Sequence, residues 1–241
     1  MKRLILQVNI KIPDNIQIKR FIPTPDIYEI SEMQARKFAK IWDVDYYQVT
    51  NNNFLPDKHP VYQRFKMYEM DYDQILYLDM DAIILPKCPN IFDRFANYKF
   101  SAVRDSPWDK TTGRSQDEKR ATYNKVYCAN ENYRPFCSGV MLIRRDFLEE
   151  TKNDWRQHLY SFDDNNGIDC GHDQAIFNKL VIGLGGHYNE LNEDWGPWYR
   201  SGKYIDHLGG PFTKRNFNKH IYCSKKSILG QQSMSLENFL E

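Results

Sequence analysis

The chain has 241 residues, and its 33 basic and 32 acidic side chains leave a net charge of +1. This balance argues against a general nucleic-acid-binding protein, because such proteins carry a broad basic excess. The length, without a linker or an internal repeat, predicts a single domain spanning residues 1–241.

The five cysteines and the apolar runs predict a soluble, cytoplasmic protein. The cysteines are scattered without metal-binding spacing, which indicates reduced thiols. The first apolar run, at 4–8, is too short for a signal peptide. No apolar run reaches the roughly 18 residues that would predict a transmembrane segment.

The first part of the chain alternates strands and helices. Apolar, β-forming residues predict a first and central strand at 4–10 and further strands at 46–49 and 75–78. Helical spacing predicts helices at 27–42 and at about 59–70. This alternation is typical of an α/β fold with a parallel, Rossmann-like sheet and crossover helices.

The second part continues with shorter elements. Strands are expected at 100–103, 136–143 and 203–207, and a loop with a short helix at 106–134. Helices are expected at 90–97, around Trp155, and from Gly171 onward.

Two carboxylates, Asp79 and Asp81, interrupt the apolar run 74–85. Side chains two apart on an extended strand point to the same side, so we expect both to converge at the carboxyl end of the strand. Ligands bind at this edge in open α/β sheets. Close carboxylates repel each other unless a cation or a shared proton relieves them, so the pair predicts a Mg²⁺ or Mn²⁺ site. The alternative is the solvated end of a strand.

Four motifs follow one another along the chain. They are the apolar strand ending in Asp79-Met80-Asp81, the run Cys137-Ser138-Gly139-Val140, the pair Asp173-Gln174, and His207 with Gly210 and Lys214. With them the chain resembles metal-dependent glycosyltransferases of the GT-A fold, most like family 8, the glycogenin and lipopolysaccharide galactosyltransferase group. Small glycosyltransferase domains of large algal viruses are also similar, which would imply the host cytoplasm. The resemblance covers residues 1 to about 215 and implies a mixed central sheet.

The family resemblance implies an activity and its residues. A sugar would move from a nucleotide diphosphate sugar, with UDP expected, to a glycan, glycoprotein or other hydroxyl acceptor, with retention of anomeric configuration. Mn²⁺ or Mg²⁺ would be held by Asp79, Asp81 and His207, and Asp173 and Gln174 would lie beside the anomeric carbon. Donor contacts would come from Gln7, Asn9, Arg64, Asp79, Asp105, Ser138, Gly139, Gly210 and Lys214.

Two positions depart from the family pattern. Cys137 stands where the family often has an asparagine that touches the donor sugar. Lys214 lies seven residues after His207, one more than usual, and Arg215 or Lys219 could replace it in holding the diphosphate.

Each candidate also has a purely structural interpretation. His207 can be a strand-end histidine, Arg64 a surface arginine, Asp173 a helix cap and Asp105 a turn residue, and Lys214 can belong to a solvated basic tail. Three aromatic residues can form either an acceptor platform or core packing: Trp195, Trp198 and Tyr199.

Two other functions remain open. A haloacid-dehalogenase-type phosphatase also has an apolar strand followed by D-x-D, with Asp79 as nucleophile. Against it, Ile83 stands where that family has Thr or Val, and the motif follows two strand–helix units. A non-catalytic nucleotide-sugar-binding module is the other alternative.

Overall fold

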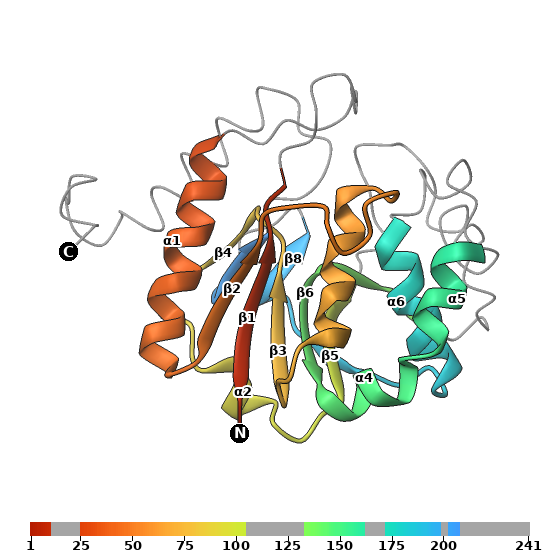
Figure 1. Ribbon diagram of the computed structural model, residues 1–241. Helices are drawn as coiled ribbons and strands as arrows, with labels where there is room; N and C mark the ends of the chain where they lie inside the picture. The colour runs from red at the N-terminus through yellow and green to blue at the C-terminus, as the bar shows by residue number, and fades with distance from the viewer. Residues whose placement is uncertain (11–24, 105–132, 162–171, 199–201, 208–241) are drawn as a thin grey trace, which may run out of the picture.

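The structure is a computed structural model that describes residues 1–10, 25–104, 133–161, 172–198 and 202–207. A six-stranded sheet has the order β2-β1-β3-β6-β5-β7, and a three-stranded sheet has the order β4-β9-β8 (Figure 1). The strands of the large sheet are β1 (Arg3–Val8), β2 (Asp45–Val49), β3 (Gln74–Leu78), β5 (Phe100–Arg104), β6 (Phe136–Arg144) and β7 (Asn189–Leu191). Those of the small sheet are β4 (Ala82–Ile84), β8 (Trp195–Trp198) and β9 (Ile205–His207).

The helices connect these strands or cover them. They are α1 (Pro25–Trp42), the 3₁₀ helix η1 (Pro60–Glu69), α2 (Ile91–Arg94), α4 (Arg145–Thr151), α5 (Asp154–Ser161) and α6 (His172–Gly183). None of these helices combines the length and the apolar character that a membrane span requires.

The large sheet is mixed, as expected. β1 pairs in parallel with β2 and β3, and β6 runs antiparallel between β3 and β5. The strands β3 and β6 occupy the middle of the sheet, so the expectation that the first strand is central was wrong. The reason is that β6, from later in the chain, extends the sheet beyond β3.

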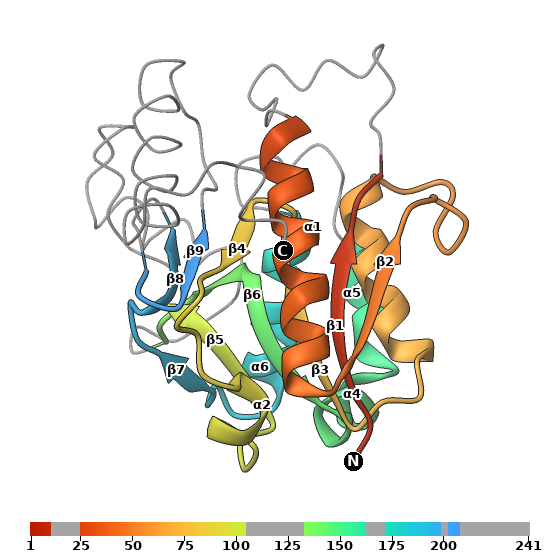
Figure 2. The ribbon, with the colours of Figure 1, turned by 90° about the vertical axis from the view of Figure 1, so that its left-hand side faces the viewer.

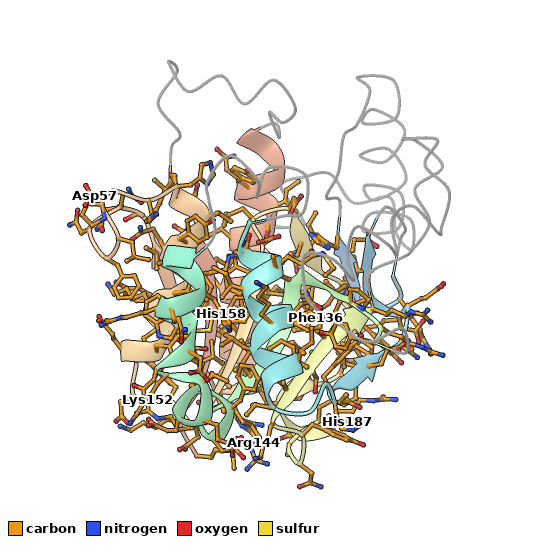
Figure 3. The ribbon with its side chains drawn as sticks, turned by 90° about the vertical axis from the view of Figure 1, so that its right-hand side faces the viewer. Asp57, Phe136, Arg144, Lys152, His158 and His187 are labelled. Carbon is orange, nitrogen blue, oxygen red and sulfur yellow. The ribbon has the colours of Figure 1, made fainter. Side chains whose placement is uncertain are left out.

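Successive side chains of each strand pack on opposite faces of the sheet. On β3, Ile75 and Tyr77 face η1, α4, α5 and α6, whereas Leu76 and Leu78 face α1, α2 and the small sheet (Figures 1 and 2). Figure 3 looks onto the first of these faces, where α5, with His158, lies beside α6. Because both faces are covered, every β3 side chain is buried, as the apolar residues 75–78 predict.

The segment expected as a helix at 59–70 is helical, but it is the 3₁₀ helix η1. Its inward residue Phe65 stacks between Trp155 and Phe177, at ring-centroid distances of 5.1 and 4.9 Å. Val61 and Met70, expected to point inward, are only partly buried. Arg64 is buried instead, because the anchored Phe65 fixes the rotation of η1 about its axis.

Several shorter elements differ from the predictions. The helix expected at 90–97 is only the four-residue α2, and α4 precedes the predicted helix around Trp155. The strands β7 and β8 were not predicted, since three or four residues give no periodic signal. Pro197 also argues against a strand, but β8 is at the edge of its sheet, where proline is tolerated.

A fully buried asparagine, Asn178 on α6, joins this helix to the start of β6. Its Oδ1 accepts from the Phe136 backbone N–H (3.1 Å) and from the Tyr133 hydroxyl (2.7 Å). Its Nδ2 donates to the backbone carbonyls of Phe136 (3.1 Å) and Gln174 (2.8 Å). One side chain therefore fixes the first turn of α6 against the first residues of β6.

We expect Asn178→Ala to lower the free energy of unfolding by at least about 2 kcal/mol, because each buried polar group left without a partner costs about 1–3 kcal/mol. Urea unfolding of the full chain measures this. The control Asn97→Ala changes an exposed asparagine and should stay within about 0.5 kcal/mol. Equal effects of the two substitutions would show that the Asn178 hydrogen bonds do not hold α6 against β6.

Candidate functional site

Asp79 and Asp81 lie in a turn between β3 and β4, at the carboxyl end of the parallel strands. The Ala82 backbone N–H donates to the Asp79 carbonyl at 2.9 Å, which closes this turn. The two residues are thus in a turn and not on an extended strand. The prediction that strand geometry makes their side chains point to the same side was therefore wrong. The apolar run 74–85 splits at this turn, so that its second half joins the small sheet.

Two antiparallel pairings bring distant residues to the turn. β6 pairs antiparallel with β3, so the start of β6 lies beside the end of β3, and the Asp79 N–H donates to the Gly139 carbonyl (2.8 Å). β9 pairs antiparallel with β4, which places His207 opposite Ala82, next to Asp81. Residues far apart in the sequence therefore surround the carboxylates.

Asp79, Asp81 and His207 form a cluster whose ligand atoms all lie within 4.8 Å of one another. The His207 Nε2 is 3.6 Å from Asp79 Oδ2 and 3.5 Å from Asp81 Oδ1. A cation about 2.1 Å from each of two ligands needs them less than about 4.2 Å apart, so this imidazole can share an ion with either carboxylate. Two carboxylates and an imidazole suit Mn²⁺ or Mg²⁺. The residues therefore fit the metal that the sequence predicts.

Gly139 is required for this cluster to form. A Cβ at this position would lie 2.1 Å from His207 Cε1, 2.4 Å from Nε2 and 2.8 Å from Asp79 Oδ2. Such distances are far below van der Waals contact, so only glycine allows the imidazole to pack against β6.

A second group of charges lies on the other side of Asp79. The buried guanidinium of Arg64 contacts Asp79 Oδ1 (2.9 Å) and Asp173 Oδ2 (2.5 Å). It also donates to the Ser138 carbonyl and hydroxyl at 3.3 Å, and stacks 4.3 Å above the Tyr77 ring. Arg64 therefore links the Asp79–Asp81–His207 cluster to the first turn of α6.

Asp173 and Gln174 come together with Ser138, as the predicted site requires. The Ser138 hydroxyl donates to Asp173 Oδ2 at 2.8 Å, and its backbone N–H donates to Gln174 Oε1 at 3.4 Å. Both α6 side chains are nearly fully buried. Asp173 thus lies in an ion pair and does not act as a simple helix cap.

The pKa shifts follow from burial and from these charges. Burial disfavours the ionised Asp79, but Arg64 and His207 outweigh it and lower the pKa of Asp79 to about 2. Burial raises the pKa of Asp173, and Arg64 only partly offsets this. Burial would lower the pKa of His207, but Cys137, Asp79 and Asp81 raise it well above its usual value. Asp79 is therefore held as the anion that a metal ligand must be.

The remaining predicted residues fall into two groups. Gln7 is fully buried between Ser31 and Tyr46, and the Asn9 N–H donates to the Val49 carbonyl, so their donor contacts stay predictions. The other predicted residues lie outside the described residues: Asp105, Tyr199, Gly210, Lys214, Arg215 and Lys219.

Of the two roles predicted for Trp195, the structure supports core packing and not an acceptor platform. Trp195 is 1% exposed and packs against Phe95 and Tyr204, so it belongs to the core. The side chain of Trp198 is outside the described residues.

Sequence analysis missed two tyrosines at the site. The Tyr77 hydroxyl donates to Asp79 Oδ1 at 2.7 Å; its place two residues before Asp79 on a strand was the signal. Tyr28, on α1, approaches the cluster: burial raises its pKa, and the charges of Asp81 and Asp79 raise it further. No local pattern in the sequence indicates this approach.

No protein-family model and no curated protein matches the sequence. Solved structures do resemble the fold. A glycosyltransferase involved in the glycosylation of the major capsid of PBCV-1 has a TM-score of 0.57 at 14% identity, over 92% of this chain and 100% of that one. The galactosyltransferase LgtC, in complex with donor and acceptor sugar analogs, has a TM-score of 0.52 at 13% identity, over 98% of each chain. The bifunctional glycosyltransferase WbbM has a TM-score of 0.54 at 13% identity, over 93% of this chain and 44% of that one.

The chain therefore has the GT-A fold of these glycosyltransferases, which confirms the predicted fold class. The phosphatase alternative is disfavoured by this fold. It is also disfavoured locally, because the Arg64 guanidinium and the Tyr77 hydroxyl both donate to Asp79 Oδ1, and this leaves that oxygen less available to attack phosphorus.

We expect Arg64→Met to lower the free energy of unfolding by about 3 kcal/mol, because it leaves Asp173 buried without its cation. The same substitution in an Asp173→Asn background should cost at least about 1 kcal/mol less, as measured by urea unfolding. Arg36→Met, which breaks an exposed pair with Glu32, is the control and should change stability by less than about 1 kcal/mol. Identical costs of Arg64→Met in both backgrounds would show that the pair is not coupled.

Gly139→Ala should destabilise the chain by about 1–3 kcal/mol, because the added methyl group overlaps His207 and Asp79. Gly183→Ala is the matched control, since a Cβ there meets nothing within 4 Å. Chemical denaturation compares the two variants. Equal stability of the two would contradict the close packing of the imidazole on β6.

Proposed function

We propose that this protein is a metal-dependent glycosyltransferase that transfers a sugar from a nucleotide diphosphate sugar, with UDP as the nucleotide, to a hydroxyl group of a glycan. The observation that carries the proposal is the Asp79–Asp81–His207 cluster at the carboxyl edge of a GT-A sheet. Ligands bind at this edge in open α/β folds. The fold shared with glycosyltransferases supports the reaction class.

Asp79, Asp81 and His207 would hold Mn²⁺ or Mg²⁺. When bound, the cation neutralises the negative charge that develops on the departing diphosphate, which is worth several kcal/mol in the transition state. The imidazole nitrogen favours Mn²⁺ over Mg²⁺. Arg64 keeps Asp79 ionised and oriented for this role.

Asp173 and Gln174 are proposed to lie beside the anomeric carbon. Both are fixed by Ser138, and Asp173 is also fixed by Arg64, so neither needs to reorganise during the reaction. A carboxylate there stabilises the oxocarbenium-like charge of glycosyl transfer. Retention of configuration, through a covalent intermediate or a same-face attack, is part of the proposal and comes from the family resemblance.

The first test is isothermal titration of UDP, and of GDP for contrast, with Mn²⁺ and then with EDTA. We expect EDTA to weaken UDP binding at least about tenfold, because it would remove the cation that Asp79, Asp81 and His207 would hold and with it the positive charge that offsets the diphosphate. Asp81→Asn should remove this metal dependence. Asp57→Asn, at an exposed residue of the loop between β2 and η1 (Figure 3), is the matched control and should retain it.

The other functions predict different results. UDP binding without hydrolysis of any UDP-sugar would favour a non-catalytic nucleotide-sugar-binding module. An absence of nucleotide binding, together with turnover of a generic phosphate ester in Mg²⁺, would overturn the proposal in favour of a phosphatase.

A further inference from the structure

The two ring nitrogens of His207 have different neighbours. Nε2 faces Asp79 and Asp81, at 3.6 and 3.5 Å. Nδ1 faces the sulfur of Cys137, at 3.9 Å. The imidazole is 2% exposed and Cys137 is 5% exposed, so bulk water is largely excluded from both. The sulfur is therefore placed to accept a hydrogen bond from Nδ1, which must keep its proton when a cation takes the place of the proton on Nε2.

The proton position matters for binding a cation. An imidazole ligand offers the lone pair of one nitrogen, and the hydrogen bond of the other nitrogen determines which one is available. If Nδ1 carries the proton and donates to Cys137 Sγ, the Nε2 lone pair points toward the carboxylates. The opposite tautomer would present an N–H group to the cation and exclude it.

The walls around the ring allow little movement. Gly139, two residues from Cys137 on β6, contacts the ring edge that carries Cε1 and Nε2. Gly196, whose φ is +103°, lies near the base of the same side chain, since a Cβ added to it would be 3.5 Å from His207 Cβ. Residues two apart on a strand point to the same side, so Cys137 and Gly139 form one surface for the imidazole.

We infer that Cys137 is a positioning residue for the metal centre: its sulfur accepts the Nδ1–H of His207 and leaves Nε2 available for the cation. This inference rests on the proposed function, because it requires that the cluster binds a metal. It also gives Cys137 a role where similar glycosyltransferases often have an asparagine that touches the donor sugar. In this chain the Cys137 side chain instead orients His207.

The test is the Mn²⁺ affinity of the full chain without nucleotide, measured from the electron paramagnetic resonance signal of free Mn²⁺. Cys137→Ala should weaken Mn²⁺ binding about tenfold, the lower end of the usual effect of removing such a partner. Cys137→Ser should lose less, because its hydroxyl oxygen can still accept a hydrogen bond. Cys88→Ala removes another buried thiol, whose sulfur donates to the Pro89 carbonyl and not to His207, and should leave the affinity unchanged.

Thermal unfolding of each variant separates positioning from loss of structure. If Cys137→Ala does not fold, Cys137→Val fills the buried volume without a polar group, and the same tenfold loss is expected. Unchanged affinity in the alanine or valine variant, or equal losses in alanine and serine, would overturn the inference. Wild-type protein that binds no Mn²⁺ would overturn the proposed function itself, and the inference with it.

Discussion

A buried guanidinium connects the parts of this site. Arg64 reaches Asp79 at the end of β3 and Asp173 at the start of α6, and it also contacts Ser138 on β6. Close carboxylates in a buried setting repel each other unless a cation separates them. Buried ion pairs contribute little net stability, but removing one partner is costly, so the pair fixes which side chains face one another. The stacked ring of Phe65, the next residue, holds the arginine in place.

Strand direction explains why the site is built from distant segments. The parallel strands β1, β2 and β3 end at one edge, where α/β folds bind ligands. β6 runs the other way, so its first residues lie at that edge beside Asp79. In the small sheet, β9 runs antiparallel to β4, so its last residue, His207, lies beside Ala82 at the start of β4. One antiparallel pairing in each of the two sheets thus brings together the residues around Asp79 and Asp81.

Small residues on β6 allow the His207 imidazole to pack close to this strand. Cys137 places its sulfur beside His207, and Gly139 leaves room for the same imidazole. Between them, the Ser138 hydroxyl donates to the carboxylate in the first turn of α6. A side chain at Gly139 would overlap both His207 and Asp79. Asn178 holds the backbone that precedes them.

The sequence alone determined the α/β alternation, the buried β3 strand and the candidate carboxylates, because apolar periodicity and the spacing of Asp79 and Asp81 are local signals. The order and spacing of four motifs also indicated the GT-A fold. Only the tertiary structure decided that Arg64 points inward, that Trp195 is core, and that Cys137 faces His207. These facts depend on how η1 is rotated and how β6 and β9 pair with their neighbours. Such contacts join residues tens of positions apart, and no local pattern encodes them.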